Sequence, residues 1–298
     1  KQFRSYIQFI KECKEYLNNE SYQYLHYLHC HDLDGIIAGY FINKNNSNLV
    51  FDMHEFYEVN GKKQKIRYLV RAMVNYLQNK SDYIIHVNKA QTKVMLNKNK
   101  QKLVYLPNYP EKENYNGCEK SKADKLRISY IGVVRQYNEL KNLMDACKKM
   151  DDVKVSIHGS GVAYKELNDI KNNYNNVVVT GIYHYTESAK LYSETDLLYA
   201  LYPTTSIQYL TSYPVKLFEA IITKTPIIVS KGTVLEDFVK EYGIGFTVDG
   251  SNVEDIRDLV KYINENRYIL DEKIENLEKI QYDYSWEEVV KNLDEIYR

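Results

Sequence analysis

Residues 213–230 read YPVKLFEAIITKTPIIVS, and this stretch decides the fold class of the second half of the chain. Ser212 suits the cap of a helix and Pro214 suits its first turn. The apolar run at 226–229 follows a short polar turn and indicates a buried strand. A helix that leads directly into a buried strand is the crossover unit of a parallel sheet, so the stretch predicts an α/β fold.

The same alternation extends in both directions over residues 126–298. Short apolar runs predict strands at 127–132, 153–158, 177–180, 196–200, 226–229 and 245–248. Amphipathic stretches predict helices at 139–150, 163–173, 186–194, 214–223, 235–242, 253–266, 269–281 and 286–297. The short connections predict a parallel sheet with helices on both faces. Ligands of such sheets bind beyond the carboxyl ends of the strands, near the switch in strand order.

The first half of the chain predicts a second, smaller α/β domain with about four strands. We expect strands at 24–30, 49–52, 83–87 and 103–105, and helices at 5–18, 35–43, 62–79 and 89–97. Two prolines within 106–110 and a polar run to 125 cannot continue either sheet. We therefore assign 1–110 to a first domain, 111–125 to a linker and 126–298 to a second domain, both Rossmann-like.

The composition limits the class of protein. Hydrophobic residues make up 44% and charged residues 27% of the chain, which is typical of a globular protein. No apolar run reaches the length of a membrane helix, and the first residues do not resemble a signal peptide. The four cysteines form no C-x-x-C pair, which indicates reduced thiols and a cytoplasmic location.

The net charge of zero hides an asymmetry between the two halves. Residues 1–125 contain 20 Lys and Arg against 13 Asp and Glu, so the acidic excess lies in the remainder. A basic first half favours an anionic partner such as a membrane surface or a phosphate-linked acceptor, and a solvated surface without a partner is the alternative. No basic and aromatic stripe suggests nucleic-acid binding.

The helix that begins near Pro214 is the first candidate ligand site. A helix N-terminus presents free N–H groups and a positive dipole end, which suit a phosphate. Glu219 lies further along this helix, where its carboxylate could accept both hydroxyls of a ribose. The alternative is an exposed helix with a solvated Glu, but the buried strand that follows argues against it.

Residues 215–230 resemble the donor-site signature of the retaining GT-B enzymes of glycosyltransferase family 4, a pattern close to K-L-F-E-apolar-A-x-x-x-P-(apolar)₃-S. Other segments resemble family segments in the same order. They are HCHDLD (29–34), FDMHE (51–55), LPN (106–108), ISYIG (128–132), VKVSIHGSG (153–161), VVVTG (177–181), LYSETDLLYALY (191–202) and YSW (284–286). The ordered set covers nearly the whole chain and implies a two-domain GT-B fold.

The resemblance implies a nucleotide-diphosphate sugar as donor and a glycan or lipid-linked acceptor, with retention of configuration. Arg135 and Lys141, which follow the Gly132 turn, would hold the diphosphate, because fixed cations stabilise the charge that the leaving group gains. Lys216 is a further candidate for this role, with solvated cations at a helix start as the alternative. Glu219 would hold the ribose.

His54 is the catalytic candidate, because it aligns with a family histidine that contacts the donor sugar. Asp52 and Glu55 flank it, and both could orient its ring. Further candidates for sugar or acceptor contacts are His31, Asp32, Glu55 and Thr211. A structural histidine is the alternative reading of His54.

A metal site is not expected in this chain. His29 and His31 would point to one face of their strand and Asp32 to the other, so zinc would lack a third ligand. GT-B enzymes as a class need no catalytic metal, and we expect no other cofactor.

Two departures from the family pattern matter. Thr211 stands where many members carry the first Glu of an E-x₇-E pair that contacts the sugar. The first domain also lacks the opening strands of the family, so we expect a partner or a further segment to cover its incomplete sheet.

The implied setting is surface polysaccharide or glycoconjugate assembly at the inner membrane face. A non-catalytic partner subunit and a nucleotide-sugar epimerase of the same fold are the alternatives.

Overall fold

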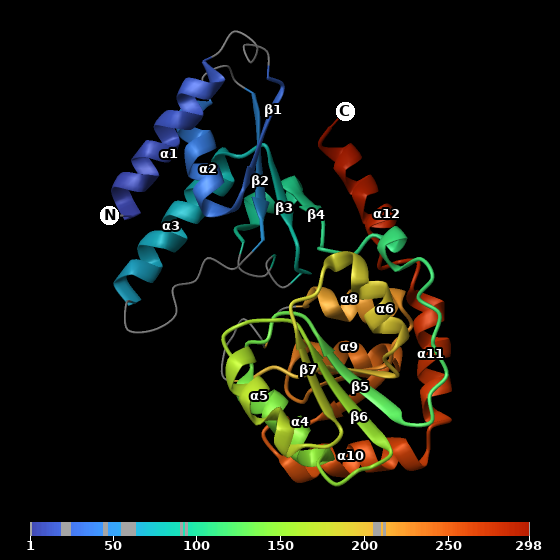
Figure 1. Ribbon diagram of the computed structural model, residues 1–298. Helices are drawn as coiled ribbons and strands as arrows, with labels where there is room; N and C mark the ends of the chain where they lie inside the picture. Colours follow the sequence, from blue (N-terminus) through green and yellow to red (C-terminus); the bar gives the residue numbers. More distant parts are fainter. Residues whose placement is uncertain are drawn as a thin grey trace. The chain divides into compact units, whose positions relative to one another are not determined.

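A computed structural model describes residues 2–18, 25–43, 47–54, 64–89, 92, 95–204, 210 and 213–297. The chain forms two compact units, Lys1–Pro107 with Val290–Arg298, and Asn108–Val289. Each unit is built on its own parallel sheet (Figure 1). Glu55, Thr211 and Ser212, which the sequence analysis singled out, lie outside the described residues.

The first unit contains a four-stranded sheet, as the sequence predicts, and its strand order is β1-β2-β3-β4. Its strands are β1 (Tyr27–His31), β2 (Asn48–Met53), β3 (Tyr83–His86) and β4 (Leu103–Tyr105). Its helices are α1 (Gln2–Leu17), α2 (Asp32–Ile42), α3 (Gln64–Lys80) and the 3₁₀-helix η3 (Asn97–Lys102). The helix expected at 89–97 includes residues outside the described part, and η3 begins where it was expected to end.

Helix α2 lies against β1 and β2 so closely that a side chain at Gly39 would not fit. A Cβ atom built on Gly39 would lie 2.3 Å from Cys30 Sγ. Helices α1 and α3 lie on the same side of the sheet as α2 (Figure 1). Because successive side chains of a strand alternate between faces, His29 and His31 point to the face opposite Cys30 and α2.

The end of the chain packs on the first unit. Helix α12 (Trp286–Val289) is followed by the 3₁₀-helix η7 (Val290–Glu295), where the sequence suggested one helix within the second domain. Asn292 Nδ2 donates a 2.8 Å hydrogen bond to the Tyr105 carbonyl at the end of β4. The Tyr297 ring meets the Tyr27 ring edge-on, 5.0 Å between centroids. These contacts explain why Val290–Arg298 groups with the first sheet.

The second unit contains a six-stranded sheet in the order β10-β9-β8-β5-β6-β7. Its strands are β5 (Leu126–Ile131), β6 (Val153–His158), β7 (Val177–Gly181), β8 (Leu197–Ala200), β9 (Ile227–Ser230) and β10 (Gly245–Val248). All six strands predicted from the sequence are present, with ends within one residue. The strand order reverses between β5 and β8, which makes the carboxyl ends of these two strands the switch point.

Helices cover both faces of this sheet (Figure 1). They are α4 (Tyr137–Cys147), α5 (Tyr164–Ile170), α6 (Ser188–Ser193), α8 (Val215–Ile222), α9 (Val234–Tyr242), α10 (Val253–Glu265) and α11 (Ile269–Ile280), with short 3₁₀-helices η4 (Lys112–Tyr115), η5 (Lys171–Asn173) and η6 (Tyr185–Glu187). Leu140 of α4 and Val260 of α10 belong to one buried cluster, and Leu217 of α8 and Leu277 of α11 belong to another. Burial on both faces explains the nearly continuous apolar strand sequences.

An ion pair ties β5 to the start of β8. The Arg127 guanidinium donates to both carboxylate oxygens of Asp196, at 3.0 and 2.6 Å, and also to Ser121. The Arg127 side chain is buried, so this bidentate pair is a structural element of the sheet.

None of the helices in the described part of the chain is both long enough and apolar enough to cross a membrane.

Candidate active site

Glycines allow the turns after β5 and β6 to pack directly on each other. Gly132 and Gly159 have φ of +136° and +129°, and a Cβ on Gly159 would lie 1.9 Å from the Gly132 carbonyl oxygen. A Cβ on Gly161 would lie 2.3 Å from the Val134 carbonyl oxygen. The Gly132 N–H donates to the His158 carbonyl at 3.0 Å. These glycines therefore form a close-packed turn at the switch point of the sheet.

Lys216 places a buried cation beside the Gly132 turn. Its Nζ atom lies 3.6 Å from the centroid of the Tyr130 ring and 5.7 Å from that of Tyr202. A Cβ built on Gly132 would lie 3.4 Å from the same Nζ. Within the described residues, this Nζ is buried and has no hydrogen-bond partner. Burial lowers the pKa of Lys216 to about 7, although the charge of Glu219 opposes that shift.

Glu219 lies one turn further along α8, and two tyrosines hold its carboxylate. The Tyr115 hydroxyl donates to Oε1 at 2.8 Å and the Tyr192 hydroxyl donates to Oε2 at 2.9 Å. Burial, and then the charge of Glu219, raise the pKa of both tyrosines, so both hydroxyls keep their protons and act as donors. Each carboxylate oxygen retains a further lone pair for a ligand.

Helix α8 begins at Val215, with Pro214 as its N-cap. Pro214 supplies no side-chain hydrogen bond to the first turn. Lys216 and Glu219 stand three residues apart and therefore lie on the same side of the helix. The structure thus brings together Gly132, Lys216, Glu219 and the start of α8.

The two remaining basic candidates differ in their surroundings. Arg135 lies exposed on the turn between Gly132 and α4. Lys141 lies within α4, where its Nζ pairs with Asp145 at 2.6 Å. The hydrogen bond to Asp145 raises the pKa of Lys141 above its usual value, and Asp145 also accepts the Tyr174 hydroxyl at 2.7 Å. The described contacts of Lys141 are therefore with Asp145 of α4 and with Tyr174, and they do not include the Gly132 turn.

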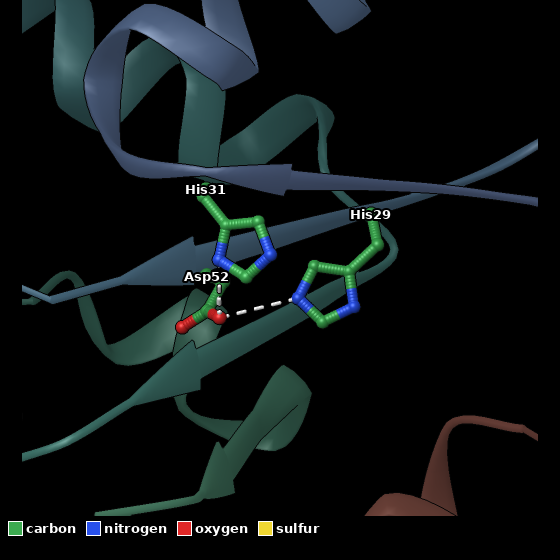
Figure 2. A group of neighbouring side chains, drawn as sticks. All are labelled: His29, His31 and Asp52. Carbon is green, nitrogen blue, oxygen red and sulfur yellow. Dashed lines mark hydrogen bonds and ion pairs between the residues drawn. The ribbon is translucent and has the colours of Figure 1, made fainter. Parts of the chain in front are cut away.

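In the first unit, three histidines converge on one carboxylate oxygen. Asp52 Oδ2 lies 3.2 Å from His29 Nε2, 3.0 Å from His31 Nδ1 and 3.2 Å from His54 Nε2. Figure 2 shows the His29 and His31 rings, both from β1, directed at Asp52 of β2. Burial would raise the pKa of Asp52, but hydrogen bonds from His29 and His54 outweigh it and hold that pKa below its usual range.

Asp32 is the first residue of α2, directly after β1, and its side chain contacts the backbone of His54. Its φ is +56°, a left-handed conformation that Asp adopts more readily than most residues. Its Oδ1 atom accepts a 3.3 Å hydrogen bond from the His54 backbone N–H. Asp32 therefore helps to position His54, and Asp52 contacts the His54 ring as the sequence suggested.

Sequence reasoning missed two members of these groups, Tyr115 and Tyr192, and part of the role of a third, Asp52. Asp52 was named only as a neighbour of His54, but the strand register places it beside His31 as well. Tyr115 and Tyr192 come from the linker region and α6, and nothing in the sequence distinguishes them among 30 tyrosines. The one sequence signal that could have placed Asp52 beside His29 and His31 is the alternation of side chains between the two faces of strands β1 and β2.

Comparison with known protein families gives one match over most of the second unit. The family model described as "Glycosyl transferases group 1" matches residues 111–282, which is more than half of the chain. No curated protein sequence matches the chain.

Several solved structures are similar in fold. Sucrose-phosphate synthase from Thermosynechococcus elongatus matches with a TM-score of 0.76 at 16% identity, over 100% of this chain and 78% of that one. A glycosyltransferase from Rickettsia africae matches with a TM-score of 0.72 at 13% identity, over 98% and 80%. HepE from Anabaena, solved with UDP, matches with a TM-score of 0.64 at 15% identity, over 89% and 74%. The predicted GT-B-like fold with two parallel sheets is thereby confirmed.

Proposed function

The chain belongs to the glycosyl transferases group 1 family, and on that premise we propose that it moves a sugar from a nucleotide-diphosphate donor with retention of configuration. One observation carries the donor assignment. At the switch point of the second sheet, the buried Lys216 ammonium stands beside the Gly132 turn without a hydrogen-bond partner among the described residues. A buried cation without a counter-ion is costly, and a diphosphate would supply that counter-ion.

The donor diphosphate would lie between the Gly132 turn and the start of α8. Lys216 and the first N–H groups of the helix would bind its oxygens, and the exposed Arg135 would reach them from the turn. Lys141 would contribute only after leaving Asp145. The fold similarity to HepE, a protein solved with UDP, supports a nucleotide donor, and the switch point of the sheet is where such a ligand is expected.

Glu219 would hold the ribose. Tyr115 and Tyr192 fix the Glu219 carboxylate before any ligand binds. The Glu219 side chain would therefore lose little conformational freedom when its remaining lone pairs accept hydrogen bonds from a ligand. This pre-organisation favours a ligand with two neighbouring hydroxyls, which a ribose provides.

The reaction breaks the bond between the sugar and the diphosphate, and the departing oxygen gains negative charge. Fixed cations and N–H groups stabilise that charge more in the transition state than in the bound donor, which lowers the barrier. The leaving phosphate can take the acceptor proton on the same face, so no protein nucleophile or metal is required. His54 would contact the sugar, held by Asp52 and by the Asp32 side chain.

A glycan or lipid-linked acceptor would bind the first unit, and the pathway would be polysaccharide or glycoconjugate assembly at a membrane surface. Helix α3 supports this part of the proposal. Its sequence contains four basic and no acidic residues. It exposes Tyr68, Leu69 and Met73 close to Arg71, a combination suited to an anionic lipid surface.

A thermal-shift panel of nucleoside diphosphates and nucleotide sugars tests the donor site. At a ligand concentration of 100 Kd, binding stabilises the protein by about 2.7 kcal/mol, which raises Tm by roughly 5 °C or more. Glu219→Ala should lose that shift, whereas the control Glu278→Ala, which removes only an exposed ion pair with Lys224, should keep it. The donor assignment is wrong if no nucleoside diphosphate raises the Tm of the unaltered chain.

Analysis of the sugar products separates transfer from the alternatives. With the donor alone, a transferase can release only free sugar and nucleoside diphosphate by transfer to water, an epimerase yields an isomeric sugar, and a non-catalytic subunit yields neither.

A further inference from the structure

We propose that His29, His31, His54 and Asp52 form a binding site for a divalent transition metal of the zinc class on the first unit. All four side chains come from β1, β2 and the residue after β2, and they share the face of the sheet opposite α2. The ligand atoms of His29, His31 and Asp52 all lie within 4.8 Å of one another.

The spacing of these atoms suits a single small cation. Zinc binds imidazole nitrogen at about 2.0–2.1 Å, so two ligands of a tetrahedral site lie about 3.3 Å apart. The three histidine nitrogens lie 3.0–3.2 Å from Asp52 Oδ2, and His31 Nδ1 lies 3.3 Å from His54 Nε2. The ligand atoms of His29 and His31 lie up to 4.8 Å apart, so the two rings would have to turn toward each other to place a metal between them.

The hydrogen-bonding pattern of Asp52 points to the same conclusion. Its side chain is only 5% exposed, and three imidazole nitrogens approach one of its oxygens. The other oxygen, Oδ1, is buried and has no hydrogen-bond partner among the described residues. An anionic carboxylate in contact with three imidazole nitrogens is available as a metal ligand, and a bound metal would replace the protons that now lie between these atoms.

The residues that contact the histidine ligands also suit a metal site. The Tyr297 hydroxyl is hydrogen-bonded to His29 Nδ1, which leaves Nε2 directed at Asp52. Metal-bound histidines usually have their second ring nitrogen held in this way, which fixes the tautomer and the ring orientation. The ring of His31 stacks on that of His29 with centroids 4.7 Å apart.

The donor set selects the class of metal. Three imidazoles with one carboxylate suit Zn²⁺, Co²⁺ and Ni²⁺, whereas Mg²⁺ and Ca²⁺ prefer sites made of oxygen atoms. Four protein ligands would leave no open position, which is typical of structural or regulatory zinc. If His54 also contacts the donor sugar, as the proposed function states, a bound metal would hold it away and lower transfer. That consequence rests on the proposed function, whereas metal binding does not.

Metal binding is measured on the untagged, chelator-treated chain, without donor or acceptor. Isothermal titration with Zn²⁺ should give one site, and Mg²⁺ should give none. His31→Ala and Asp52→Asn should each weaken Zn²⁺ binding by at least about tenfold. The exposed His26 lies just before β1 and outside the cluster, so His26→Ala should bind as the unaltered chain does. The Asn variant preserves the shape of Asp52, and its Tm reports whether the fold is intact.

Cobalt distinguishes this site from the four free cysteines. Co²⁺ bound by histidine and carboxylate gives visible bands of a four-coordinate ion without the intense near-ultraviolet charge-transfer band of a thiolate. The proposal is overturned if no Zn²⁺ binds, if the thiolate band appears, or if His31→Ala and Asp52→Asn bind Zn²⁺ as tightly as the unaltered chain. In any of these outcomes, the donor assignment of the second unit would stand or fall on its own thermal-shift result.

Discussion

The affinity for a nucleoside diphosphate should fall as the pH rises above 7, because Lys216 loses its charge. Burial lowers the pKa of this lysine to about 7 in the free protein. A bound diphosphate favours the charged form and raises that pKa, so binding is strongest where Lys216 is already protonated. The terminal phosphate is nearly fully ionised above pH 7 and does not reverse the trend.

The size of the effect follows from the protonated fraction. With a pKa of about 7, roughly half of the lysine is charged at pH 7 and about 1% at pH 9. If only the charged form binds the diphosphate, Kd rises about 50-fold across this range, or about 2.3 kcal/mol. Isothermal titration with UDP at pH 7, 8 and 9, at constant ionic strength, measures this change in Kd.

Lys216→Arg is the matched variant, because a guanidinium stays charged throughout this range. It should bind UDP with an affinity that is nearly constant from pH 7 to 9. Lys120 is the main competing group, since burial lowers its pKa to about 8. It is unchanged in the Arg variant, so a slope that persists there would assign the titration to another group and refute the role given to Lys216.

Three further predictions concern packing and the surface. Gly159→Ala should destabilise the second unit by about 4 kcal/mol in urea unfolding, because its Cβ would lie 1.9 Å from a backbone atom. The control Gly232→Ala has nothing within 4 Å of the added Cβ, so it should cost only about 1–2 kcal/mol for its positive φ. A loss below about 2 kcal/mol for Gly159→Ala would show that the two turns can separate. Arg127→Met should cost about 3 kcal/mol, because it removes the bidentate partner of the partly buried Asp196 carboxylate and leaves it only the backbone N–H of residue 127. Lys224→Met, in an exposed pair, should cost under about 1 kcal/mol, and equal losses would contradict the structural role of the Arg127 pair. Leu69→Glu should reduce sedimentation with vesicles that contain anionic lipid, and unchanged sedimentation would remove α3 from the proposed membrane surface.

The second sheet is the part of the fold that could be predicted most fully. Its strands are buried on both faces, so each appears as a short apolar run, and local turn residues mark the ends. The crossover at 213–230 was recognisable for the same reason, because the helix, the turn and the buried strand are contiguous in the chain. Val290–Arg298 could not be placed in this way, since its contacts with Tyr105 and Tyr27 join residues far apart in sequence.

The candidate site also has features that the sequence predicted and features that depend on contacts between distant segments. The sequence by itself determined that Gly132 follows a strand and that Lys216 and Glu219 belong to one helix, because secondary structure and the family pattern are local. Only the tertiary structure decided that Lys216 is buried against Tyr130, that Tyr115 and Tyr192 hold Glu219, and that Lys141 pairs with Asp145. Strand register likewise decided that Asp52 lies among three histidines. Burial, pKa and hydrogen-bond partners depend on which distant segments meet, and no local pattern of residues specifies that.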